Sequence, residues 1–173
     1  MCTIATEIGQ FKMAWIGMID ENDVLKMVSF RGDEEGAAKI LQMSEFHYKD
    51  PQFKHIPTVK VLQTGKYEFN NNVQETPSLI KWREEFVKQR IFASISLPIF
   101  KFGKVIGILG FHATIKDFFD PQEIELLEEA VGDISFALEI FEKTKKHKEM
   151  EELVEMNEKR FRKITEKNYD MKI

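Results

Sequence analysis

The chain has 173 residues, of which 43% are hydrophobic, and its formal net charge is −4. This length suits one domain of ordinary size, or one domain followed by a helical extension. The small negative charge gives no overall field that would attract nucleic acid or an anionic membrane, which excludes those partners as a first expectation. The single cysteine, Cys2, excludes an internal disulfide framework and a cysteine-based zinc site, so a reducing cytoplasm is the expected setting.

The first segments predict a helix end followed by a β-hairpin. Residues 2–8 have helical spacing and Gly9 breaks it, so we expect the chain to begin inside a larger protein. Two runs of apolar and β-branched residues, 11–19 and 24–31, flank the polar turn 20–23. No apolar run has the length of a signal peptide or a membrane span.

Short elements and polar loops alternate in the middle of the chain. Proline near the start and glycine past the end are typical of a short helix, and Pro57 and Gly65 have this arrangement. The predicted elements, in order, are a helix at 33–43, a loop at 47–55, a helix at 57–64, a strand at 67–70, and a helix that opens at Thr76-Pro77 with Leu79, Trp82 and Phe86 on one stripe.

Residues 90–113 predict a second hairpin, with Lys101-Phe102-Gly103 as a three-residue loop that places Phe100 opposite Lys104. One predicted face packs against helices and consists of Ile91, Ala93, Ile95, Leu97, Ile99, Val105, Leu109 and Phe111. The other face mixes hydroxyls, a glycine and an imidazole with apolar residues, as a small-molecule cavity does. Its members are Phe92, Ser94, Ser96, Pro98, Ile106, Ile108, Gly110 and His112.

The last third of the chain predicts a long helix. Asp120 suits the N-cap, Pro121 the first helical position and Glu123 a capping box. We expect Ile134, Leu138 and Phe141 to lie on the sheet. Further on, apolar residues recur in alternating steps of four and three, which is typical of a coiled coil. The predicted dimer seam is Met150, Val154, Asn157, Phe161 and Ile164.

Together these elements predict an α+β fold with an antiparallel sheet of five or six strands, helices on both faces and a long C-terminal helix. In their order they resemble a GAF domain of multidomain signalling proteins, such as sensor histidine kinases and diguanylate cyclases. The motifs that carry the resemblance lie at 14–17, 64–66, 82–85, 93–99, 103–109 and 118–120.

The resemblance implies a domain organisation. It assigns residues 1–142 to a GAF domain and residues 143–160 to a helical, coiled-coil-like linker. Residues 161–173 resemble the incomplete beginning of a PAS domain. GAF domains bind small molecules between the sheet and the short helices and dimerise through their terminal helices, so a homodimer and a small-molecule ligand are expected.

The ligand itself stays open. The hairpin is similar to that of phytochromes, in which the matching serines and histidine face the bilin. No cysteine lies near the middle of this chain, so covalent bilin attachment is not expected. The signature of cyclic-nucleotide GAF domains is not evident either.

The candidate ligand-binding residues are Trp15, Asn72, Trp82, Phe92, Ser94, Ser96, Gly110 and His112. For each there is a structural alternative: the serines and the histidine as satisfied buried polar groups, the tryptophans as core, the asparagine as a turn residue. An enzyme is not expected. Some GAF-like proteins reduce methionine sulfoxide with several cysteines, which one cysteine cannot do, and the four histidines show no metal-ligand spacing.

Two functions remain open from the sequence. The first is a cytoplasmic sensor module that relays ligand binding through its C-terminal helix to an output domain. The alternative is a GAF module without a ligand, which serves dimerisation and spacing.

Overall fold

The computed structural model describes residues 11–32 and 46–170. The helices predicted at 2–8 and 33–43 lie outside the described residues. The chain divides into two compact units, one up to Ser135 and one from Phe136 onwards. Each unit is described by itself. Within the described residues, no helix combines the length and the apolar character that crossing a membrane requires.

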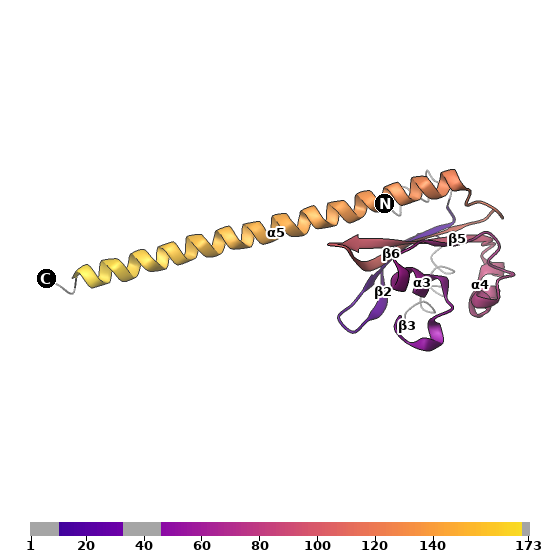
Figure 1. Ribbon diagram of the computed structural model, residues 1–173, viewed down its shortest axis with the longest axis horizontal. Coiled ribbons are helices and arrows are strands. Elements are labelled where there is room, and N and C mark those ends of the chain that lie inside the picture. Colours follow the sequence, from indigo (N-terminus) through magenta and orange to yellow (C-terminus); the bar gives the residue numbers. More distant parts are fainter. Residues whose placement is uncertain (1–10, 33–45, 171–173) are drawn as a thin grey trace. The chain divides into compact units, whose positions relative to one another are not determined.

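The first unit is built on a six-stranded sheet (Figure 1) with the order β3-β2-β1-β6-β5-β4. All of its strand pairs are antiparallel. The strands are β1 (Met13–Ile19), β2 (Val24–Gly32), β3 (Phe46–His47), β4 (Glu68–Asn70), β5 (Ala93–Lys101) and β6 (Lys104–Ala113). The predicted α+β class and strand number are therefore confirmed.

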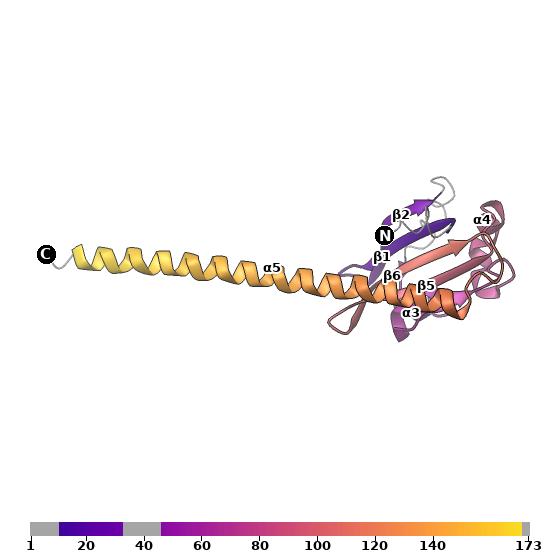
Figure 2. The same cartoon turned by 90° about the horizontal axis from the view of Figure 1, so that it is seen from above.

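Short helical elements cover one face of the sheet, and the first part of a long helix covers the other (Figure 2). The elements are η1 (Pro51–Phe53), α3 (Pro57–Thr64), η2 (Pro77–Trp82), α4 (Arg83–Lys88) and α5 (Pro121–Asp170). Gly65 ends α3 with a left-handed φ of 66°, as predicted. Asp120 caps α5, since its Oδ1 accepts the Glu123 backbone N–H at 2.8 Å.

Two expected elements differ from the prediction. The segment predicted as the loop 47–55 contains the last residue of β3 and the turn η1. The helix predicted to open at Thr76-Pro77 begins instead as the 3₁₀ element η2 and becomes α-helical only at Arg83. Its predicted apolar stripe is nevertheless right, because Leu79, Trp82 and Phe86 are all buried.

The predicted register of the second hairpin is wrong. The loop has two residues, Phe102 and Gly103, with φ of 50° and 74°, and Lys101 pairs with Lys104. An irregularity at Ile99/Phe100 then moves the pairing by two residues relative to the prediction. Because side chains alternate with a period of two, this shift keeps most residues on their predicted faces.

Two residues of the predicted helix-packing face lie elsewhere. Ile91 precedes β5, and its N–H donates to the Phe86 carbonyl at 2.8 Å. Val105 lies on the turn side of the irregularity, opposite Phe100. Both pack with the core cluster that contains Trp15, Val59 and Leu79, on the face that the short helices cover.

The opposite face of the sheet packs through aromatic rings and the start of α5. The ring centroids of Phe11 and Phe111 lie 4.7 Å apart, and those of Phe118 and Phe119 lie 5.2 Å apart. On α5 the buried stripe consists of Ile124, Leu127 and Val131. Ile134, expected on the sheet, is half-buried. Leu138 and Phe141, for which the same was expected, belong to the second unit.

The second unit is the continuation of α5, which stays helical to Asp170 as the spacing predicted. Its charged side chains pair along the helix, for example Lys159 with Glu155 at 2.6 Å and Lys146 with Glu142 at 3.7 Å. Four apolar members of the predicted seam are about half exposed or more: Met150, Val154, Phe161 and Ile164.

Candidate functional site

The central hairpin brings its polar side chains to one face of the sheet. Ser94 pairs directly with His112, and Ser96 pairs with Gly110. On the other side of β6, β1 places Trp15 opposite Gly110. The prediction that Ser94 and His112 share a face is confirmed, since both line one cavity under the short helices.

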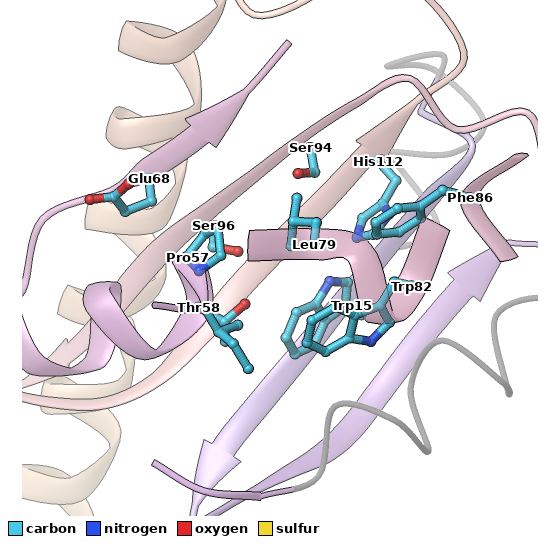
Figure 3. A pocket seen from close by; sticks show the side chains of 11 residues that line it. Trp15, Pro57, Thr58, Glu68, Leu79, Trp82, Phe86, Ser94, Ser96 and His112 are labelled. Carbon is cyan, nitrogen blue, oxygen red and sulfur yellow. The ribbon is translucent and has the colours of Figure 1, made fainter. Parts of the chain in front are cut away.

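This cavity lies between the sheet and the segments that carry α3, η2 and α4 (Figure 3). Its volume is about 40 Å³. A single water needs roughly 10–15 Å³ measured in the same way, so a cavity of this size has room for two or three waters. Ligand sites for larger organic molecules are commonly about 300–1,000 Å³.

His112 forms one wall and is buried, with 6% of its surface exposed. Figure 3 shows its ring beside that of Phe86, and the two ring centroids lie 5.7 Å apart. Burial among apolar groups lowers the pKa of His112 to about 4, because desolvation disfavours the imidazolium. At neutral pH the ring is therefore uncharged, and its buried Nδ1 has no hydrogen-bond partner within the described residues.

Trp82 also lines the cavity, and it carries a second unpartnered nitrogen. Only 4% of its surface is exposed, and its buried Nε1 has no acceptor among the described residues. Leaving a buried polar group unpaired costs about 1–3 kcal/mol. Two such groups in the lining of one small cavity therefore favour a hydrogen-bonding occupant, either water or a ligand.

Gly110 lets Trp15 lie flat against the sheet. A Cβ at Gly110 would overlap the Trp15 indole ring at Nε1 and Cε2. Glycine at this position has φ outside the left-handed region, so its role is space and not backbone freedom. The close approach of Trp15 to Gly110 thus fixes one wall of the cavity.

The structure separates the predicted site residues into two sets. Five of them line the cavity: Trp15, Trp82, Ser94, Ser96 and His112. Gly110 lies beneath Trp15. The remaining two, Asn72 and Phe92, do not line it.

Asn72 belongs to the turn after β4, where its N–H donates to Asn70 Oδ1 at 2.8 Å and its carbonyl accepts from Thr76 Oγ1 at 2.9 Å. This arrangement fits the structural alternative that was given for Asn72, a turn residue. Phe92 lies ahead of β5 in a different hollow, with Lys12, Arg90 and Thr114. Lys116 Nζ lies 5.9 Å from its ring centroid.

Sequence reasoning missed six residues of the lining, all of them from outside the central hairpin. These residues are Ile56, Pro57, Thr58, Glu68, Leu79 and Phe86. A signal existed for Glu68, because it pairs with Ser96 in the register of the edge strand β4. The first turn of α3 reaches the cavity only through tertiary packing, so no local pattern could have identified Ile56 to Thr58.

The four histidines lie on different segments of the chain. His47 is in β3, His55 in the segment before α3, His112 in the cavity and His147 in the second unit, where its Nε2 lies 3.2 Å from Glu151 Oε1. Across residues 11–32 and 46–170, no three histidine, cysteine, aspartate or glutamate side chains gather in an arrangement that could hold a metal ion.

Comparison with known proteins gives one family match. The family model described as "GAF domain" matches residues 1–139. A search of curated proteins finds no significant match to the sequence.

Several solved structures are similar in fold. The GAF domain region of a protein from Geobacter sulfurreducens PCA has a TM-score of 0.67 and 22% identity, covering 80% of this chain and 88% of that one. A domain of a protein described as a two-component sensor histidine kinase, from Sinorhizobium meliloti 1021, has a TM-score of 0.57 and 18% identity, with coverages of 82% and 87%. Free methionine-R-sulfoxide reductase from Neisseria meningitidis, in complex with its substrate, has a TM-score of 0.60 and 17% identity, with coverages of 78% and 71%. At these identities the likeness concerns the fold alone.

Proposed function

Because this chain belongs to the GAF domain family, we propose that it is a sensor module that binds a small molecule in the cavity between the sheet and the short helices. The observation that carries the proposal is the pair of unpartnered nitrogens, His112 Nδ1 and Trp82 Nε1, in the lining of this cavity. Structures of the same fold include a sensor histidine kinase domain and an enzyme in complex with its substrate.

The lining defines the chemistry of the proposed ligand. Trp82 Nε1–H can only donate, so the ligand must present an acceptor there. The uncharged His112 ring accepts at one nitrogen and donates at the other, and the hydroxyls of Ser94 and Ser96 can do both. The proposed ligand is therefore a hydrogen-bonding organic molecule. A molecule larger than two or three waters requires the walls from α3 and η2 to move apart.

The relay in this proposal runs from the sheet to α5. Ser135 on α5 accepts the Phe100 backbone N–H of β5 at 3.0 Å, so the sheet and the helix are joined at that point. We further propose a non-catalytic, cytoplasmic module, in keeping with its single cysteine. In the parent protein it would precede a PAS domain that begins near residue 161, and a histidine kinase or diguanylate cyclase output domain.

The proposal is tested by filling the cavity. We expect a broad metabolite set, including methionine sulfoxide, to contain a compound that raises the Tm of the wild-type chain, and the Ser94→Leu variant to lose that increase, since leucine occupies the cavity. Methionine sulfoxide should not be reduced. Ser29→Leu makes the same exchange at an exposed position of β2 and should keep the response. Absence of any stabilising compound, or an unchanged response of Ser94→Leu, would contradict a ligand role.

The small volume of the cavity favours the alternative function, a ligand-free module for dimerisation and spacing. Under this alternative the two unpartnered nitrogens bind ordered water. Ser94→Leu would displace that water, leave the nitrogens unpaired and lower stability. The metabolite screen decides between the two functions, because only a ligand site is expected to give a compound that raises the Tm.

Dimerisation through α5 is a separate part of the proposal. The residues of the seam follow one another in alternating steps of four and three from Met150 to Ile164, with the polar Asn157 in the middle. The four apolar members, Met150, Val154, Phe161 and Ile164, are exposed in the single chain. We expect the wild-type chain to be a dimer by light scattering. Val154→Asp should convert it to a monomer, because each chain would bury a carboxylate in the seam.

Met156→Asp provides the matched control for Val154→Asp. Met156 is 62% exposed on the same helix but lies outside the seam. This variant should therefore remain dimeric. A monomeric wild-type chain at high concentration, or equal effects of the two substitutions, would refute the seam.

A further inference from the structure

A groove of about 520 Å³ lies at the far end of the central hairpin, away from the cavity described above. Its lining comes from the α3–β4 connection, the second half of β5, and one side of α5 between Glu128 and Ser135. No residue belongs to the linings of both the groove and the cavity. The volume falls in the range that small-molecule sites occupy.

The floor of the groove is apolar and preformed. Leu97 and Val131 are buried, with 0% and 6% of their surfaces exposed, and Pro98 follows Leu97 on β5. The Phe100 ring packs against Gly65, where a Cβ would lie 3.2 Å from its Cζ. On the α5 side, a Cβ at Gly132 would meet no heavy atom of the described residues within 4 Å, so this glycine leaves the groove open.

The groove is closed to an added β-strand. The edge strand β4 pairs only with residues from Ser94 to Ser96, which leaves the rest of β5 beside the groove. Pro98 has no N–H, and the Phe100 N–H donates to Ser135 Oγ at 3.0 Å. The Ser135 hydroxyl in turn donates to the Val131 carbonyl at 2.8 Å. A peptide strand would find no free backbone N–H donors on β5 at Pro98 and Phe100. The occupant must therefore bind through its apolar part and its charges.

Two opposite charges stand at the rim, on different walls. Lys66 comes from the α3–β4 connection and Glu128 from α5, and both side chains are exposed. A purely anionic or purely cationic molecule would meet attraction on one wall and repulsion on the other. A zwitterion can pair with both, while its apolar part packs over Pro98, Phe100 and Val131.

We propose that this groove is a second ligand site, which binds a small zwitterion with an apolar body, of the kind that a free amino acid with a large hydrophobic side chain represents. The site does not depend on the ligand of the cavity. Its occupant contacts β5 and α5 together, next to the Ser135–Phe100 hydrogen bond that joins them.

The experiment titrates the full chain with L-phenylalanine and L-leucine by calorimetry and thermal shift. We expect saturable binding of at least one of them, with a Kd of roughly 1 mM or below, as befits a partly open site. The matched analogues 4-methylpentanoate and 3-methylbutylamine each keep one charge and should bind about tenfold more weakly. Lys66→Gln and Glu128→Gln should each reduce the affinity for the amino acid by a similar factor.

Filling the groove provides the decisive variant. Gly132→Leu places a side chain in the open space and should abolish binding, whereas Gly132→Ala gives the helix the same gain in propensity while filling little of the groove, and should retain it. Ser94→Leu, which fills the cavity, should leave binding intact. Absence of binding by both amino acids, equal binding of the singly charged analogues, or loss of binding in Ser94→Leu but not in Gly132→Leu would overturn the proposal.

Discussion

Replacement of Gly110 by alanine is expected to destabilise the domain by about 3 kcal/mol, equivalent to a fall in Tm of roughly 6–12 °C for a chain of this length. The added Cβ would overlap the indole of Trp15, which is 5% exposed and cannot move outwards. The ring can retreat only towards the cavity that it lines, so the same substitution should also close the proposed ligand site. Urea unfolding and the metabolite response measure the two effects.

A second substitution shows whether the ring is the cause. In a Trp15→Phe background the smaller side chain leaves room for the Cβ, so Gly110→Ala should cost clearly less there, and the double-mutant cycle should give a coupling of about 1 kcal/mol or more. Gly132→Ala is the matched control, because its Cβ meets nothing and the helix should gain up to about 1 kcal/mol. Additive effects at Trp15 and Gly110 would contradict this explanation.

The free energy of unfolding is expected to fall by about 3 kcal/mol between pH 6.5 and pH 4 on account of His112 alone. Burial holds the pKa of His112 at about 4 in the folded chain, against 6.5 for the unperturbed group. Between these two values the unfolded chain binds more protons than the folded chain, so stability decreases as the pH decreases. Above pH 6.5 the contribution is fully present, and below pH 4 no further loss comes from this residue.

The measurement is urea unfolding of the wild-type chain and of His112→Leu at several pH values. The difference between the two curves isolates His112, since other titrating groups are common to both. His55→Gln removes an exposed histidine and should leave the pH dependence unchanged. A wild-type curve parallel to that of His112→Leu would show that the imidazole is not held neutral in the folded chain. A ligand that pairs with His112 Nδ1 should alter the slope.

The faces of the central hairpin could be predicted from the sequence because side-chain alternation survives a register error of two residues. Ser94 and His112 therefore share a face, although the predicted loop was one residue too long. The error arose because Phe102 adopts a left-handed φ of 50°, a conformation that sequence rules assign first to glycine and asparagine. The irregularity at Ile99/Phe100 has no local signature, so Val105 was placed on the wrong side.

The candidate site was predicted most completely where it is built from the central hairpin. Ser94, Ser96 and His112 follow from strand parity, and the two tryptophans were candidates as aromatic residues. The other contributions of α3 and η2 depend on how these elements pack on the sheet. Asn72 was included for its amide, and Phe92 because the predicted parity of the hairpin placed it on the cavity face. Asn72 lies two residues after the end of β4 at Asn70, and Phe92 lies one residue before the start of β5 at Ala93. Outside the strands, alternation no longer fixes the direction of a side chain.

The strand order has a consequence for how the chain reaches this fold. Each of the two hairpins joins neighbouring segments, so its contacts require only short loops to close. The sheet becomes continuous only when β1 pairs with β6, for example Met13 with His112. That pairing closes a loop spanning most of the first unit. The conformational entropy lost on closing this loop is larger than the entropy lost on closing either hairpin. The cavity walls contributed by Trp15 and His112 are thus brought together by contacts between residues far apart in the sequence, and contacts of this kind form most slowly.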